Sequence, residues 1–145
     1  MIHLQKITYN NFMSYTDLEH THEYVGSAAM VLAEAYALRE RWTAYGIADG
    51  DTPIGMVLVM DKPFGEPCDH AFSEFFIADA YLRKGNGNAA MTKIIQKCKE
   101  NGFGEVRVVV DEENTALLSF MQKYGFTNIG KSPWNERYYI LTIAP

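Results

Sequence analysis

The segment Leu82-Arg83-Lys84-Gly85-Asn86-Gly87-Asn88-Ala89-Ala90 decides how the rest of this chain is interpreted. Its two glycines allow the backbone to approach a ligand closely, and a helix is predicted to begin at about Asn86. A helix start carries amides without intrahelical acceptors and the positive end of the helix dipole. With Arg83 and Lys84 beside these amides, the segment predicts a cradle for a phosphate or diphosphate. The alternative is a solvated basic turn in front of a surface helix.

The same glycines fit the dinucleotide fingerprint Gly-x-Gly-x-x-Ala, so a nucleotide-binding domain has to be considered. In that fold the first glycine directly follows a strand. Here residues 79–84 separate Gly85 from the predicted strand that ends at Ala78. The chain is also too short for the two halves of a dinucleotide-binding domain. A dinucleotide site is therefore a weak interpretation of this segment.

Hydrophobic periodicity predicts strands and helices along the whole chain. Strands are expected at 2–8, 42–48, 54–60, 70–78, 106–110, 126–129 and 138–143, and helices at 11–18, 23–40, 86–101 and 115–124. Tight loops imply antiparallel pairing of the second, third and fourth strands, whereas a helical crossover implies parallel pairing of the fourth and fifth. The predicted fold class is α/β, with a mixed, mostly antiparallel sheet and helices on both faces.

Composition limits the classes of protein to which the chain can belong. It has 145 residues, 48% hydrophobic and 21% charged, which indicates one folded domain over residues 1–145. The net charge of −5 argues against nucleic acid as a partner. Two cysteines are too few for a disulfide framework, and neither a membrane span nor a secretory signal is evident. We expect a cytoplasmic protein without a membrane partner.

His20 and His22, with Glu23 beside them, are the only residues whose spacing suggests a metal. They lack a nearby fourth ligand and precede a predicted helix, so capping and solvation are favoured over coordination. No metal is therefore expected.

Together with its flanking residues, the glycine segment resembles the acyl-CoA loop of the GCN5-related N-acetyltransferase (GNAT) family. The family pattern Val-x-Pro-x-Tyr, then Arg/Gln-x-x-Gly-x-Gly/Ala, corresponds here to Ile77-Ala78-Asp79-Ala80-Tyr81 and then residues 82–89. The predicted order of elements is also that of the family, so the resemblance covers nearly the whole chain. Short segments at 42–55 and at Phe75-Phe76-Ile77 are similar to spermine/spermidine-type and other small-amine members.

A second family motif is matched downstream. The family's Asn, its Tyr seven positions later and its Gly-Phe correspond to Asn114, Met121 and Gly125-Phe126. The chain departs from the family twice, with Leu82 where the loop usually begins with Arg or Gln, and with Met121 where a Tyr is common. The first departure is partly offset by Arg83, the next residue.

The resemblance implies acetyl-CoA as a co-substrate and suggests which residues bind it. The backbone of Phe76, Ile77 and Ala78 would face the pantetheine arm. The loop that holds the diphosphate would consist of Leu82, Arg83, Lys84, Gly85, Asn86, Gly87, Asn88 and Ala89. Asn114, Phe120 and Lys123 would flank the pantetheine or the nucleotide end.

The resemblance also implies direct transfer of acetyl to an amine, without a covalent enzyme intermediate. The amine must lose a proton to attack, and Glu74, a carboxylate in a predicted aromatic strand, is the candidate base. Its alternatives are a solvent-facing position or a structural ion pair. Met121 has no proton to give to the CoA thiolate. Tyr124, three residues further on, is the candidate donor, and core packing is its alternative.

We therefore predict an N-acetyltransferase that acts on the primary amine of a small molecule such as a polyamine. Acidic residues in the first helices could attract a cation, although solvation also explains them: Asp17, Glu19, Glu23 and Glu34. Two other interpretations stay open, an acetyltransferase for protein N-termini or aminoacyl-tRNA, and a non-catalytic acyl-CoA-binding regulatory module. A homodimer would agree with the family, in which such pairs are common.

Overall fold

Two antiparallel sheets lie next to each other in the computed structural model, which describes residues 1–66, 69–113, 115–131 and 136–142. The first sheet has the order β1-β2-β3-β4, and the second has the order β5-β7-β6. The first contains β1 (Ile2–Lys6), β2 (Trp42–Asp49), β3 (Thr52–Met60) and β4 (Phe72–Ile77). The second contains β5 (Glu105–Asp111), β6 (Thr127–Lys131) and β7 (Glu136–Thr142).

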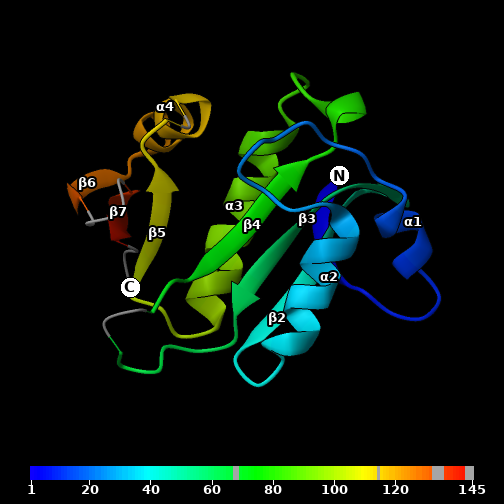
Figure 1. The fold of residues 1–145 in the computed structure, drawn as a ribbon, viewed down its shortest axis with the longest axis horizontal. Coiled ribbons are helices and arrows are strands. Elements are labelled where there is room, and N and C mark those ends of the chain that lie inside the picture. The colour runs from blue at the N-terminus through cyan, green and yellow to red at the C-terminus, as the bar shows by residue number, and fades with distance from the viewer. Residues whose placement is uncertain (67–68, 114, 132–135, 143–145) are drawn as a thin grey trace.

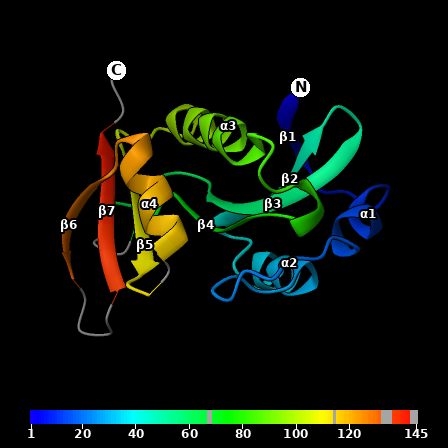
Figure 2. The same cartoon turned by 90° about the horizontal axis from the view of Figure 1, so that it is seen from above.

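Helices cover both faces of the first sheet, as Figure 2 shows. The helices that the structure describes are α1 (Phe12–Thr16), α2 (Ala28–Ala37), α3 (Asn86–Glu100) and α4 (Thr115–Tyr124), with a 3₁₀ turn at Asp79–Tyr81. α3 packs on one face, α1 and α2 pack on the other, and α4 lies beside the second sheet. The predicted mixed α/β class, mostly antiparallel with helices on both faces, is confirmed.

The core joins the two sheets beneath α3. This helix presents an apolar stripe at helical spacing, formed by Ala90, Met91, Ile94 and Cys98, all buried. The stripe belongs to the same buried cluster as residues of β3 and the inward-facing valines of β5. Burial of each of the larger side chains in this cluster, such as Met91 and Ile94, contributes about 1.5–3 kcal/mol to folding. The position of α3, and with it the glycine loop that precedes it, is therefore fixed by both sheets.

The strands β4 and β5 run in the same direction and separate toward their carboxyl ends (Figure 1). Near their start, the amide of Ala71 donates a hydrogen bond to the carbonyl of Arg107 at 3.2 Å. The parallel direction agrees with the sequence prediction, but the described residues form no ladder between these strands, which belong to different sheets. A cavity lined by residues of both strands forms an opening between β4 and β5.

A β-bulge in β4 accounts for part of this divergence. Met56 pairs with Phe76 and Leu58 with Ser73, so two residues of β4, Glu74 and Phe75, oppose one residue of β3. Glu74 takes up the extra length with a φ of 53°. A bulge bends the strand and increases its twist. The bulge therefore changes the course of β4 at Glu74 and re-aims that side chain.

The helix expected over residues 23–40 is shorter than predicted. It begins at Ala28, where the Ser27 hydroxyl accepts a hydrogen bond from the amide of Met30 at 3.2 Å. The residues before Ser27 instead cross the end of β4. This connection contributes to the site described next.

Candidate functional site

The start of α3 presents three amides that have no intrahelical acceptor. Gly85 precedes the helix in a left-handed conformation, with φ 77°, and the first intrahelical bond is donated by Ala89 to Gly85 at 3.2 Å. The amides of residues 86–88 come before that bond. The Asn86 side chain donates to the carbonyl of Tyr81 at 2.9 Å, which ties the loop to the preceding turn.

Space and positive charge surround these amides. A Cβ atom added to Gly85 would meet no atom within 4 Å, and one added to Gly87 would meet only the Phe120 ring, at 3.9 Å. Arg83 and Lys84 are exposed beside them, and Lys84 Nζ lies 5.9 Å from the centre of the Tyr81 ring. The loop therefore has the donors, the charge and the room that a diphosphate requires. Leu82, at its head, is exposed and apolar.

The edge of β4 opposite β3 carries main-chain groups that take no part in the pairing with β3. The Ala78 amide donates to the carbonyl of Ile54 at 2.8 Å and so belongs to the pairing with β3. Because successive peptide groups in a strand point to opposite sides, the amide and carbonyl of Ile77 point away from β3. The Ile77 carbonyl is 3.2 Å from Nε2 of His22. Of the three predicted β4 residues, Ile77 thus offers its amide to the opening.

A cavity of about 290 Å³ occupies the space between β4 and β5. Glu74 lines it, together with residues of both strands and of neighbouring segments. These are Tyr24, Val25, His70, Phe72, Ser73, Phe75, Val108, Val109, Val110, Asp111 and Leu117. The sequence contained no signal for most of them, because long-range packing brings them together.

Negative charge gathers around this cavity. Partial burial, and then the charge of the Glu74 carboxylate, raise the pKa of Glu34 on α2. Desolvation, and then the charges of Glu23, Asp111 and Glu113, raise the pKa of Tyr24. Within the described residues, neither Glu34 nor Glu74 forms a salt bridge. A cation in the cavity would relieve this repulsion.

The two other acidic residues expected near an amine lie in a different place. Asp17 and Glu19 line a hollow of about 740 Å³ on the far side of the end of β4, beside Asp79. The pKa of Asp79 is lowered by hydrogen bonds from Thr21. These residues are therefore separate from the Glu74 cavity.

The helix α4 reaches the cavity through Leu117 and the glycine loop through Phe120. Phe120 lies nearest to Gly87, and Lys123 is exposed. The Tyr124 hydroxyl lies 3.3 Å from that of Thr92 on α3, so Tyr124 is not brought together with Glu74. Met121 is fully buried. Asn114 lies outside the described residues.

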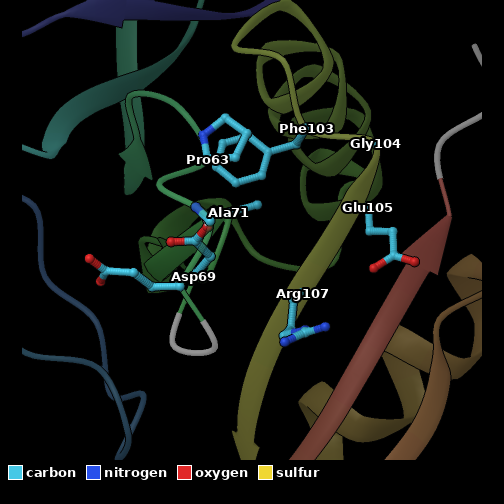
Figure 3. Close-up of a pocket in the computed structure, with 9 residues that line it drawn as sticks. Pro63, Asp69, Ala71, Phe103, Gly104, Glu105 and Arg107 are labelled. Atoms are coloured by element: carbon cyan, nitrogen blue, oxygen red, sulfur yellow. Dashed lines mark hydrogen bonds between the residues drawn. The ribbon is translucent and has the colours of Figure 1, made fainter.

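A separate hollow of about 300 Å³ lies where β4 and β5 start (Figure 3). It contains none of the predicted site residues; its lining includes Pro63, Ala71, Phe103 and Arg107. Asp69 at its wall accepts hydrogen bonds from the amides of Phe64 and Gly65, both at 2.9 Å. These bonds give Asp69 a structural role in the loop before β4.

One motif was missed in the sequence. Residues 125–132 read Gly-x-x-x-x-Gly-Lys-Ser, the pattern of a phosphate-binding loop. That loop leads from a strand into a helix, with the Lys at the helix start. Here Thr127–Lys131 is instead the strand β6, paired antiparallel with β7, and Lys131 forms a salt bridge with Glu112 at 2.9 Å. The match does not have the structure that phosphate binding requires.

Two kinds of feature are absent from the described part of the chain. No three His, Cys, Asp or Glu side chains there are grouped so that they could hold a metal ion. Nor does any helix there have the length and apolar character needed to cross a membrane.

Comparison with known proteins agrees with this geometry. The family model described as the Acetyltransferase (GNAT) family matches residues 8–126. No curated protein sequence matches the chain.

Solved structures resemble the whole chain at low sequence identity. An acetyltransferase from Thermus thermophilus is 18% identical, with a TM-score of 0.73 and coverage of 99% of this chain and 97% of that one. The PaiA N-acetyltransferase from Thermoplasma acidophilum, in complex with coenzyme A, is 15% identical, with a TM-score of 0.68 and 99% coverage of both chains. The ribosomal-protein-S18-alanine N-acetyltransferase from Escherichia coli is 14% identical, with a TM-score of 0.68 and coverage of 100% and 97%. These likenesses show a shared fold, and the family match over most of the length shows that the chain belongs to the GNAT family of acetyltransferases.

Proposed function

We propose that this protein transfers acetyl from acetyl-CoA directly to the primary amine of a small, cationic molecule such as a polyamine. The observation that carries the proposal is the presence of two features on either side of β4: unpaired amides at the start of α3, and a cavity between β4 and β5 that Glu74 lines. The first suits a diphosphate and the second suits a cation, as such a transfer requires.

Acetyl-CoA supplies the thioester whose acetyl group is transferred. The amides of residues 86–88, with Arg83 and Lys84, would hold the diphosphate. The Ile77 amide, which points away from β3, would donate to the thioester oxygen as negative charge develops on it. In the balanced reaction, the amine nitrogen bonds to the acetyl carbon and the carbon–sulfur bond breaks. Glu74 would take the proton of the amine, and a proton is returned to the thiolate.

The charge around the cavity supports an acceptor that carries positive charge. The charge of Glu74 raises the pKa of Glu34, and neither residue forms a salt bridge among the described residues. Asp111 lines the same cavity as Glu74. An amine enters as an ammonium ion, and these carboxylates would attract it before Glu74 removes the proton. We infer that Glu74→Gln lowers kcat by at least about a hundredfold, within the range of general-base effects. Wild-type kcat/KM at every pH would remove Glu74 from the mechanism.

Tyr124 is our proposed donor to the thiolate, because Met121 cannot donate. Its hydroxyl lies against Thr92 on α3, so the role requires the leaving sulfur to come within reach of that helix. Tyr124→Phe should then lower kcat by about tenfold or more, with little change in KM for acetyl-CoA. The matched variant Tyr24→Phe removes a phenol that lines the cavity. If only Tyr24→Phe lowers kcat, Tyr124 serves packing between α3 and α4.

The function is tested by following release of the CoA thiol with a panel of amines. The panel contains spermidine, spermine, free amino acids, an aminoglycoside and peptides with free N-termini. We expect turnover with a small cationic amine and none with peptides of neutral charge. Turnover restricted to peptide N-termini would contradict the small-molecule proposal. Binding of CoA without turnover on any amine would instead indicate an acyl-CoA-binding regulatory module.

A further inference from the structure

The segment between α1 and α2 is bonded to the end of β4 at several points. The Thr21 amide donates to the Asp79 carboxylate at 3.1 Å, and the Asp79 amide donates to the carbonyl of Glu19 at 3.0 Å. The His22 ring lies 3.2 Å from the carbonyl of Ile77. The segment therefore crosses the carboxyl end of β4 in a fixed place.

His20 lies at the centre of this segment and makes three contacts. Its Nε2 is 2.7 Å from the carbonyl of Gly26, and its Nδ1 is 3.1 Å from the amide of His22. Its ring packs against Phe76 with the centroids 4.3 Å apart. Because the carbonyl needs a donor and the amide needs an acceptor, one neutral tautomer satisfies both, with its proton on Nε2. The Asp79 carboxylate interacts electrostatically with this ring and with that of His22.

Gly26, whose carbonyl is bonded to His20, also contacts Glu74 through its amide. The Gly26 amide donates to Oε2 of Glu74 at 3.0 Å. The space around Gly26 is tight, since an added Cβ atom would lie 3.0 Å from the Met30 side chain and 3.3 Å from that same Oε2. A short chain of contacts thus links the His20 ring, Gly26 and the Glu74 carboxylate.

We propose that His20 is the positioning residue for Glu74, acting through Gly26. This inference rests on the proposed function, in which Glu74 is the base. By fixing Gly26, the imidazole keeps one amide directed at Oε2, which leaves Oε1 for the amine. An amide donor also favours the ionised carboxylate, the form that accepts a proton. Without His20, the carboxylate would lose its orientation and would protonate more readily.

Three variants separate this role from simple packing. His20→Phe keeps a ring against Phe76 but removes the donor to Gly26 and the acceptor for His22. His20→Gln restores a side-chain donor and acceptor. His3→Phe, on the edge strand β1, is the control for the loss of a histidine elsewhere. The acceptor is the panel amine that gives the highest kcat/KM.

Kinetics give the first readout. We expect His20→Phe to lower kcat about tenfold, as for a charge-assisted hydrogen bond that orients the base, with KM for acetyl-CoA unchanged. The acidic limb of the kcat/KM profile should move to higher pH, and His20→Gln should recover most of both effects. In a Glu74→Gln background, His20→Phe should have no further effect.

A second readout does not depend on turnover. In protein labelled with ¹³C at glutamate carboxyl carbons, the Glu74 resonance is assigned by its loss in Glu74→Gln. Its titration midpoint should move to higher pH in His20→Phe and return in His20→Gln. If the Glu74 titration midpoint in both His20→Phe and His20→Gln equalled that of the wild type, the role of His20 would be overturned. This holds even if kcat fell equally at every pH. If Glu74→Gln were fully active while the midpoint moved, the proposed base would be wrong and the contact through Gly26 would stand.

Discussion

At the scale of single residues, the backbone conformation of Gly85 determines the shape of the loop before α3. Its φ of 77° is readily adopted by glycine, whereas a side chain there costs about 1–2 kcal/mol. Arg83, two residues earlier, bears such a cost, with a φ of 62°. Non-glycine residues in this strained conformation are concentrated at functional sites. Here both residues turn the chain so that the amides of residues 86–88 are open to a ligand.

Gly85→Ala tests this role against a closely matched control. Gly65 has nearly the same φ, 76°, and an added Cβ atom there also meets nothing within 4 Å. We expect both alanine variants to lose a similar free energy of unfolding, about 1–2 kcal/mol. Only Gly85→Ala should weaken CoA binding, by about tenfold in isothermal titration calorimetry, because its methyl group occupies space next to the diphosphate. Equal CoA affinity in both variants would contradict the proposal that the diphosphate binds next to Gly85.

Sequence and structure differ most instructively at Glu74. Its residue type and its aromatic strand were sufficient to predict a candidate base. Its left-handed φ and its bond to Gly26 were not predictable, because they depend on the register of β4 against β3 and on a contact 48 residues away. Residue chemistry is local information, whereas a bulge is decided by which strand lies alongside.

The elements themselves were largely predictable at the next scale. Helix α4 has the predicted limits, and α3 and the strands agree within a few residues, because their apolar periodicity is strong. The predicted start of α2 was wrong, because residues before Ser27 contact β4 instead of continuing the helix. The absent ladder between β4 and β5 was also not predictable. Sequence gives the crossover and thus the direction, but not how far two strands diverge.

Gly55 on β3 is a position where a side chain would disturb the pairing of β3 with β4. An added Cβ atom there would collide with the carbonyl oxygen of Phe76 on β4. Gly55→Ala should therefore separate β3 from β4 and lower the free energy of unfolding by about 1–3 kcal/mol. Gly104→Ala, where a Cβ atom meets nothing within 4 Å, is the control and should be nearly neutral. Urea unfolding measures both, and equal stability would contradict the close packing of β3 on β4.

At the scale of the whole molecule, two buried side-chain oxygens among the described residues have no hydrogen-bond partner: the Tyr15 hydroxyl and Oδ1 of Asp69. Tyr15 is fully buried under α2, and its hydroxyl has no hydrogen-bond partner in the described part of the chain. Burial raises its pKa from 10.0 to about 12. The folded state therefore keeps this proton where the unfolded state loses it. The resulting contribution to stability is complete below pH 10 and is lost as the pH rises toward 12.

Tyr15→Phe is expected to leave the protein as stable as the wild type at neutral pH, or more stable by about 1 kcal/mol, because it removes an unsatisfied buried group. It should also flatten the fall in stability above pH 10. Tyr9→Phe, at an exposed position, should change neither. Urea unfolding at neutral and alkaline pH measures these effects. A clear loss of stability at neutral pH would show that the hydroxyl has a partner.

The central claim is that the amides at the start of α3 bind the diphosphate of coenzyme A. A ¹H–¹⁵N correlation spectrum recorded during titration with CoA tests this most directly. We predict saturable shifts of the amides of residues 86–88, accompanied by that of Ile77 on the open edge of β4. Shifts confined to the hollow near Gly65 and Gly104, or no shifts at saturating CoA, would contradict it.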